Sequence, residues 1–285
     1  MITLAIPNKG RMNGEIIRLL EKIGLDVPEG GRKLYANTNN PNIKIVYARA
    51  ADIPLYVESG TADIGITGDD MVMESGTEVE KLLKLNFGAC KIAVAAPNDS
   101  KVKTPADYYD GIRIATKLPN IAQNYFKSKS VNCKIIRISG ATELAPYLGI
   151  ADIIVDQVST GTTLAANNLR MIDQISESYI FLIANRTSVK EKEAEIDELK
   201  LSFESIISAE GKRYIMANVK SKKALDQVIL ALPSLESPTV LSLAKEGEYA
   251  VHTVVDSMTL ISTIRKIKQA GAKDILVMNM SRVVE

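Results

Sequence analysis

The stretch from Gly149 to Leu164, GIADIIVDQVSTGTTL, constrains the fold more than any other part of the chain. Its apolar run at 151–155 contains β-branched residues and predicts a buried parallel strand. Four hydroxyl side chains surround one glycine at 159–163, and the leucine and alanines that follow favour a helix. A buried strand, a short polar loop and a helix in this order are typical of an α/β sheet.

The loop inside this stretch has the composition of a phosphate-binding site. The first N–H groups of a helix lack partners within the helix, and the helix dipole adds partial positive charge there. Hydroxyl groups would add donors, and a glycine lets the backbone approach an anion closely. Asp156, where the strand would end, could accept hydrogen bonds from sugar hydroxyls, which together predicts a ribose 5-phosphate site. An ordinary turn with a Ser or Thr N-cap is the alternative. The candidate loop residues are Ser159, Thr160, Gly161, Thr162 and Thr163.

The same stretch resembles the signature of the ATP phosphoribosyltransferase family. The resemblance rests on Glu143, five residues, Gly149, and then DQVSTGTTL from Asp156 to Leu164. It implies an enzyme of histidine biosynthesis that transfers the phosphoribosyl group of 5-phosphoribosyl-1-pyrophosphate to N1 of ATP and releases pyrophosphate. Mg²⁺ would accompany the pyrophosphate and offset its charge. In this interpretation Glu143 and Asp156 hold the ribose hydroxyls, and the loop holds the 5-phosphate.

Length and charge narrow the class of protein further. With 285 residues the chain is long enough for two or three domains. A formal net charge of +1 gives no bulk attraction to nucleic acid or to a membrane surface. No apolar run reaches the roughly 20 residues of a membrane helix, and the N-terminal segment does not resemble a signal peptide. We therefore expect a cytoplasmic protein that binds neither nucleic acid nor membrane.

Three basic residues follow expected strands in the first part of the chain. A strand at 2–6 precedes Lys9 and Arg11, and a strand at 43–48 precedes Arg49. Ligands in open α/β sheets bind at the carboxyl ends of strands, so these cations could meet a polyphosphate. The resemblance places basic turns of this kind at the nucleotide site and makes the three residues catalytic candidates. Solvated loop charge is the alternative interpretation.

A short internal repeat suggests two similarly folded lobes. The pattern Gly-x-Ala-Asp-Ile occurs at 60–64 and again at 149–153, each time before an apolar strand. Two such lobes would bind a ligand between their strand ends. The loop that follows the strand of the first copy carries Asp69 and Asp70, which would repel phosphate, so we assign this loop to the base, the ribose or Mg²⁺. The alternative is that these aspartates only cap a helix. The ATP-binding candidates are Thr67, Gly68, Asp69 and, at the end of a strand at 112–116, Thr116.

Alternating strands and helices predict an α/β protein with a bilobal, periplasmic-binding-protein-like core. Residues 1–90 with 184–210 would form the first lobe, and residues 91–183 the second, with the phosphoribosyl site. We expect strands at 91–96, 112–116, 133–138, 171–175 and 180–183, the last returning to the first lobe. We expect helices at 120–129, 142–148 and 188–208.

The tail, 211–285, has the strand and helix order βαββαβ of a ferredoxin-like domain. The resemblance implies the long form of the family, whose C-terminal regulatory domain binds histidine as a feedback inhibitor, and a homo-oligomer assembling from dimer to hexamer. The segments around Glu236 and 270–272 resemble its two characteristic turns. The histidine-binding candidates are Asn218, Ser237, Thr239 and Ala272.

Two other functions remain open from the sequence. A non-catalytic bilobal protein that binds a small ligand would also have two α/β lobes with facing strand ends. A phosphoribosyltransferase acting on another base would differ only in the first-lobe pocket.

Overall fold

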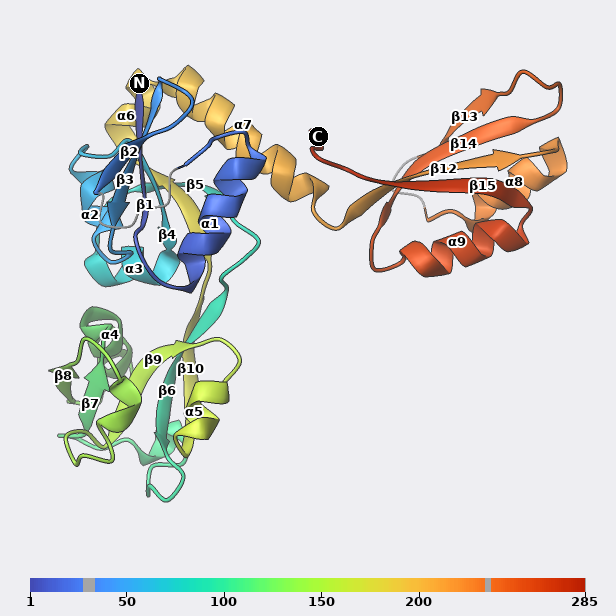
Figure 1. Cartoon of the computed structure of the whole chain (residues 1–285). Coiled ribbons are helices and arrows are strands. Elements are labelled where there is room, and N and C mark those ends of the chain that lie inside the picture. Colours follow the sequence, from blue (N-terminus) through green and yellow to red (C-terminus); the bar gives the residue numbers. More distant parts are fainter. Residues whose placement is uncertain (28–33, 234–236, 285) are drawn as a thin grey trace. The chain divides into compact units, whose positions relative to one another are not determined.

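The computed structural model describes residues 1–27, 34–233 and 237–284 of the chain. It divides into two compact units, Met1–Lys200 and Leu201–Glu285 (Figure 1). The division falls inside helix α7, Glu193–Ala209, ten residues before the expected start of the tail at 211. No helix within the described ranges is both long and apolar enough to cross a membrane.

The first unit begins with a six-stranded sheet in the order β2-β3-β1-β4-β11-β5. β1 pairs in parallel with β3 and β4, whereas β11 runs antiparallel to β4 and β5. The sequence did not predict β2 and β5, because neither carries a long apolar run. The strands are Ile2–Pro7 (β1), Tyr35–Asn37 (β2), Ile43–Ala48 (β3), Ile64–Gly68 (β4), Glu80–Lys84 (β5) and Ile180–Ala184 (β11). The helices are Arg11–Lys22 (α1), Ile53–Glu58 (α2) and Asp69–Ser75 (α3).

A second sheet of five strands has the order β10-β6-β9-β7-β8. β7 pairs in parallel with β8 and β9, and β6 runs antiparallel to β9 and β10. The strands are Cys90–Pro97 (β6), Arg113–Thr116 (β7), Lys134–Arg137 (β8), Ile153–Val158 (β9) and Leu169–Ser178 (β10). The helical segments are Pro105–Asp107 (η1), Pro119–Ser128 (α4), Thr142–Leu144 (η2) and Thr162–Ala166 (α5). The helix expected at 142–148 was wrong: only a short 3-10 turn forms, followed by Pro146, which lacks a backbone donor.

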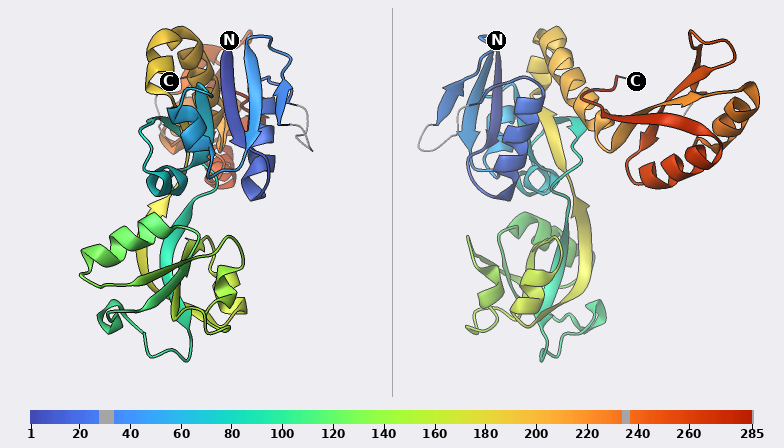
Figure 2. Two further views of the ribbon diagram at one scale, coloured as in Figure 1. Left: turned by 90° about the vertical axis from the view of Figure 1, so that its left-hand side faces the viewer. Right: turned by 45° about the vertical axis from the view of Figure 1, so that its right-hand side comes forward.

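The chain crosses between the two sheets twice, along neighbouring segments (Figure 2). Ser178 pairs with Cys90 at the end of the β6–β10 ladder. The Leu85 amide then donates to the Ile180 carbonyl at 2.8 Å, where the first sheet begins. Only Tyr179 separates β10 from β11, so the chain returns to the first sheet at 180 rather than at 184.

The repeated Gly-x-Ala-Asp-Ile pattern has the same structural role in both sheets. Gly60 and Gly149 have positive φ angles of 74° and 67°, which favour glycine. The Asp63 carboxylate accepts from the Thr3 amide at 2.8 Å, joining the start of β4 to β1. The Asp152 carboxylate accepts from the Arg113 amide, also at 2.8 Å, joining β9 to β7. The two lobes therefore begin their central strand pairs in the same way.

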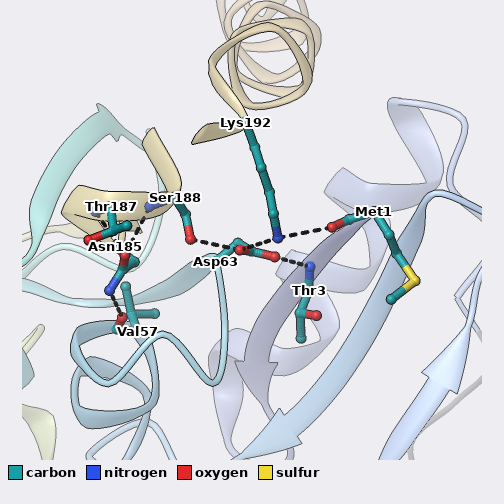
Figure 3. Close-up of polar contacts among 8 residues, drawn as sticks. All are labelled: Met1, Thr3, Val57, Asp63, Asn185, Thr187, Ser188 and Lys192. Carbon is teal, nitrogen blue, oxygen red and sulfur yellow. Dashed lines mark hydrogen bonds and ion pairs between the residues drawn. The ribbon is translucent and has the colours of Figure 1, made fainter. Parts of the chain in front are cut away.

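Asp63 also holds the helices that follow the first sheet (Figure 3). The helix expected at 188–208 is divided into α6, Arg186–Glu191, and α7, with Lys192 between them. The Lys192 ammonium group donates to Asp63 at 2.6 Å and to the Met1 carbonyl at 3.2 Å. The Ser188 hydroxyl donates to the same carboxylate at 2.7 Å. Because Asp63 is only 5% exposed, its charge depends on these partners.

The second unit contains the expected ferredoxin-like pattern. Its four strands form an antiparallel sheet in the order β13-β14-β12-β15. Apolar side chains from both helices and from β12 and β14 form one buried core. The strands are Lys212–Val219 (β12), Thr239–Ser242 (β13), Tyr249–Asp256 (β14) and Ala272–Asn279 (β15), and the helices are Lys222–Ala231 (α8) and Leu260–Gln269 (α9).

Candidate active site

A cavity of about 690 Å³ lies between the strand ends of the two lobes. The second lobe supplies β9, the loop after it and the segments that follow β7 and β8. The first lobe supplies the start of α3 and the segment after β3. All seven residues predicted for the phosphoribosyl group line this cavity: Glu143, Asp156, Ser159, Thr160, Gly161, Thr162 and Thr163.

The loop at 159–163 presents its hydroxyl groups rather than using them to cap a helix. Gly161 has a φ of 77° and precedes α5, and no side chain caps that helix. The Ser or Thr N-cap considered from the sequence is therefore wrong. Thr160 and Thr162 are exposed, with their hydroxyl oxygens 2.9 Å apart. Such a pair can donate to one anion without first breaking a bond to the backbone.

A carboxylate and an ammonium group lie side by side at the base of this loop. Asp156 lies within β9 rather than after it, and its side chain is 14% exposed. The Lys117 ammonium nitrogen, from the segment after β7, is 3.6 Å from an Asp156 oxygen. The pair offers an acceptor for sugar hydroxyls and a cation for an anionic group.

Arg137, the last residue of β8, and Ser139, which follows that strand, also line the cavity although the sequence did not single them out. The signal that could have found them is their position close to the end of the expected strand at 133–138. In the structure this strand is β8, which pairs in parallel with β7, the neighbour of β9. Arg137 adds a second cation to the second-lobe wall. Both residues become candidates only once the strand order β9-β7-β8 is known.

The ATP candidates lie mostly behind the cavity wall. Gly68 lines the cavity. Buried Thr67 donates its hydroxyl to the Ala50 carbonyl at 2.8 Å, and Ala50 lines the cavity. Buried Thr116 accepts from the Leu118 amide at 2.8 Å, and Leu118 lines it too. These two hydroxyl groups therefore support wall residues. Asp69 begins α3 and forms an ion pair with Lys81.

The basic candidates of the first lobe are close in sequence to residues that line the cavity, but they are not themselves among the described lining residues. Lys9 and Arg49 are exposed. Arg49 directly precedes Ala50 and Ala51, which do line the cavity. Arg11 begins α1, and its side chain lies outside the described part of the structure.

The described side chains that line the cavity do not form a cluster of three metal ligands. Its acidic lining residues are Asp70, Glu143 and Asp156. Among the described side chains, no three His, Cys, Asp or Glu residues group closely enough to hold a metal ion. A Mg²⁺ ion that keeps water ligands and uses substrate phosphates needs only one or two protein carboxylates. These carboxylates could therefore serve as the one or two protein ligands of such an ion.

The histidine-binding candidates lie on different strands of the tail. Asn218 in β12 donates to Asp274 at 3.3 Å, and Ala272 pairs with Val219. Thr239 lies in β13, at the opposite edge of the sheet from β15. Three strand spacings separate those edges, which is about 14 Å. Ser237 is exposed just before β13, and Glu236 lies outside the described residues. One copy of the tail does not bring Thr239 and Ala272 together.

Comparison with known proteins places these features in a family. A family model described as "HisG: ATP phosphoribosyltransferase" matches residues 49–205, and "HisG, C-terminal domain" matches residues 209–282. The chain is similar to an ATP phosphoribosyltransferase of Methanothermobacter thermautotrophicus, with 43% identity over 99% of both chains. It is 44% identical to that of Methanococcoides burtonii over the full length of both. A solved "ATP phosphoribosyl transferase (HisG:HisZ) complex from Thermotoga maritima" is similar with a TM-score of 0.63 and 31% identity, covering 71% of this chain and 96% of that chain.

Proposed function

This chain belongs to the ATP phosphoribosyltransferase family, and we propose that N1 of ATP displaces pyrophosphate from 5-phosphoribosyl-1-pyrophosphate in its cavity. The protein is an enzyme of histidine biosynthesis that transfers a pentosyl group. The observation that carries the proposal is the hydroxyl loop at 159–163, which lines the same cavity as Glu143 and Asp156. Because the reaction consumes ATP, we place it in the cytoplasm.

The chemistry needs positioning and charge, not a covalent enzyme intermediate. The bond from C1 of ribose to the pyrophosphate oxygen breaks, a bond from C1 to adenine N1 forms, and pyrophosphate leaves with the electron pair. The 159–163 loop would anchor the 5-phosphate, while Glu143 and Asp156 hold the ribose hydroxyls. Lys117 and Arg137 would add positive charge on the second-lobe wall, an assignment supported by their place in the lining.

The ATP would lie against the first-lobe wall. Gly68 would allow its close approach, while Thr67 and Thr116 would act through the wall residues they support. We assign Lys9, Arg11 and Arg49 to the pyrophosphate or the ATP phosphates, because they follow strands that end at this wall. Asp69 would act with them on the ribose or on a metal.

Mg²⁺ is the proposed cofactor, and Asp156 or Glu143 would hold it together with the pyrophosphate oxygens. When bound, it offsets the negative charge that builds up on the leaving group.

The direct test mixes the protein with ATP, Mg²⁺ and 5-phosphoribosyl-1-pyrophosphate and measures phosphoribosyl-ATP by mass spectrometry. We expect product and stoichiometric pyrophosphate. Product with another purine but not with ATP would support a phosphoribosyltransferase of different base specificity. Tight substrate binding without turnover would support the non-catalytic binding protein.

Thr160→Val is expected to lower kcat/KM for 5-phosphoribosyl-1-pyrophosphate by about tenfold or more, because one hydrogen bond to a charged group is lost. Steady-state kinetics with varied sugar substrate checks this. Thr187→Val makes the same change on α6, at a residue that is not among the described lining residues, and should leave the kinetics unchanged. Equal kinetics for the Thr160 variant and the wild type would contradict the assignment of this loop.

We further propose that histidine inhibits the enzyme through the tail, with Asn218, Ser237, Thr239 and Ala272 as contacts. Because Thr239 and Ala272 lie at opposite edges of one sheet, a histidine touching both would need residues from two copies. Residues from two copies would require a homo-oligomer, which we propose to be a dimer that assembles to a hexamer.

Deletion of residues 211–285 is expected to abolish inhibition by histidine. The measurement is the phosphoribosyl-ATP assay with increasing histidine, with circular dichroism as the control that the shortened protein is folded. Inhibition that survives in a folded truncation would exclude the tail as the regulatory site.

A further inference from the structure

Asp70 is a buried carboxylate in the cavity wall whose two oxygens are both held by the protein. It is 2% exposed. The Ser178 hydroxyl donates to one oxygen at 2.8 Å, and accepts from the Asp70 amide at 3.1 Å. The Gln157 side-chain amide donates to the other oxygen. Since both oxygens are engaged, this carboxylate is suited to hold protein elements rather than to take a proton from a substrate.

These three residues join the two lobes. Asp70 is the second residue of α3 in the first lobe, Gln157 lies in β9 of the second lobe, and Ser178 ends β10 where the chain crosses back. All three line the cavity. We call this set, Asp70, Gln157 and Ser178, the interlobe clasp. A buried charge held by hydrogen bonds fixes the geometry of its partners more firmly than a solvated one.

Gly68 provides the space that the clasp requires. Its φ of −74° is ordinary for any residue, so the backbone does not demand glycine. A Cβ at this position would overlap the Asp70 carboxylate oxygen that binds Ser178. The position of Asp70 therefore explains why residue 68 is a glycine, independently of any contact with ATP.

A second carboxylate on α3, that of Glu74, also forms hydrogen bonds with the second lobe. Glu74 lies one turn after Asp70, and its two oxygens accept from the Asn120 and Ile121 amides, each at 3.0 Å. The Asn120 side chain donates to the Glu74 carbonyl at 2.8 Å. These amides belong to the first turn of α4, where backbone donors lack helical partners. Helix α3 thus contacts the second lobe through two carboxylates.

We propose that Gln157 is a positioning residue for phosphoribosyl transfer: through Asp70 it holds β9 at one distance from the first lobe. Asp156 is the preceding residue of the same strand, and its carboxylate accepts from the Gln157 amide at 2.8 Å. Fixing Gln157 therefore fixes Asp156 and the start of the hydroxyl loop against the wall that receives ATP. This inference rests on the proposed function, since it needs both substrates in this cavity.

The test exchanges the hydrogen-bond donor of Gln157 and the acceptor of Asp70 between the two positions. In Gln157→Glu two carboxylates face each other, so we expect kcat to fall about tenfold or more. The Asp70→Asn/Gln157→Glu double variant restores one donor and one acceptor in reversed order, and we expect it to recover most of that loss. Ser178 can still donate to the asparagine oxygen. Gln123→Glu, an exposed change on α4, is the matched control and should leave kcat unchanged.

Three results would overturn the inference. One is full kcat in Gln157→Glu, and another is a double variant no more active than Gln157→Glu alone. The latter is expected if Gln157 instead contacts substrate directly. If the double variant does not fold, Gln157→Met decides the question, because it removes the donor at similar volume; an unchanged kcat there would also contradict the clasp. A wild type that forms no phosphoribosyl-ATP would overturn the proposed function itself.

Discussion

Asp156→Ala is expected to lower kcat for phosphoribosyl-ATP formation by about 100- to 1,000-fold, the range found when one preorganised polar group is removed from an active site. The side chain lies at the base of the hydroxyl loop, 3.6 Å from the Lys117 ammonium group. Its loss would remove one of the two carboxylates proposed to hold the ribose hydroxyls and would leave Lys117 without this carboxylate. Steady-state kinetics and single-turnover product formation measure the effect on binding and on chemistry separately.

Two further variants make this result specific. Asp99→Ala removes an exposed carboxylate outside the cavity lining and should leave kcat unchanged. Asp156→Asn keeps an acceptor but removes the charge, so it should fall between the wild type and the alanine variant. Near-normal turnover in Asp156→Ala would contradict the placement of the sugar in this part of the cavity.

Asp63→Ala is expected to lower the free energy of unfolding of the first unit by about 3 kcal/mol, because it leaves a lysine and two further donors without their buried acceptor. Thr3, Ser188 and Lys192 all donate to this carboxylate. Urea unfolding followed by circular dichroism measures the change. Glu78→Ala breaks the exposed ion pair with Arg186 and should cost less than about 1 kcal/mol. Equal losses in the two variants would contradict the special role of Asp63.

The contribution of Asp63 to the free energy of unfolding should also depend on pH. Burial by itself would raise the pKa of this carboxyl, but the hydrogen bonds from Lys192, Thr3 and Ser188 lower the pKa below its ordinary value. A carboxyl with a lowered pKa in the folded state stabilises the protein above its ordinary pKa, which is about 4. That stabilisation is lost as the pH falls through the folded-state pKa. The difference in unfolding free energy between wild type and Asp63→Asn should therefore shrink below about pH 4. A constant difference down to pH 3 would contradict this.

The sequence predicted those strands and helices that have a clear pattern in their own few residues. Buried strands such as β9 carry runs of β-branched residues, and the repeated Gly-x-Ala-Asp-Ile pattern correctly indicated two lobes built alike. Strand β5 was missed because its sequence, EKLLK, is mostly charged, and it is a strand only through pairing with β11. The helix expected at 142–148 does not form, because Pro146 interrupts it.

The candidate site likewise contains residues that a local motif predicts and residues that meet only in the folded protein. The hydroxyl loop and Asp156 belong to one continuous motif, so the sequence alone could bring them together. Asp70 and Gln157 are 87 residues apart, and no local pattern indicates their contact. Thr116 was predicted from its place at a strand end, and the structure adds that its hydroxyl accepts from the nearby Leu118 amide.

The two crossing segments determine how the cavity can change its width. One passes through Tyr179 alone, and the other through residues 86–89, where Gly88 has a φ of 69°. Since the strands on either side are paired, rotation about any single bond of one segment must be matched in the other. A change in the width of the cavity would therefore require both segments to bend together and the Asp70–Gln157 contact to break.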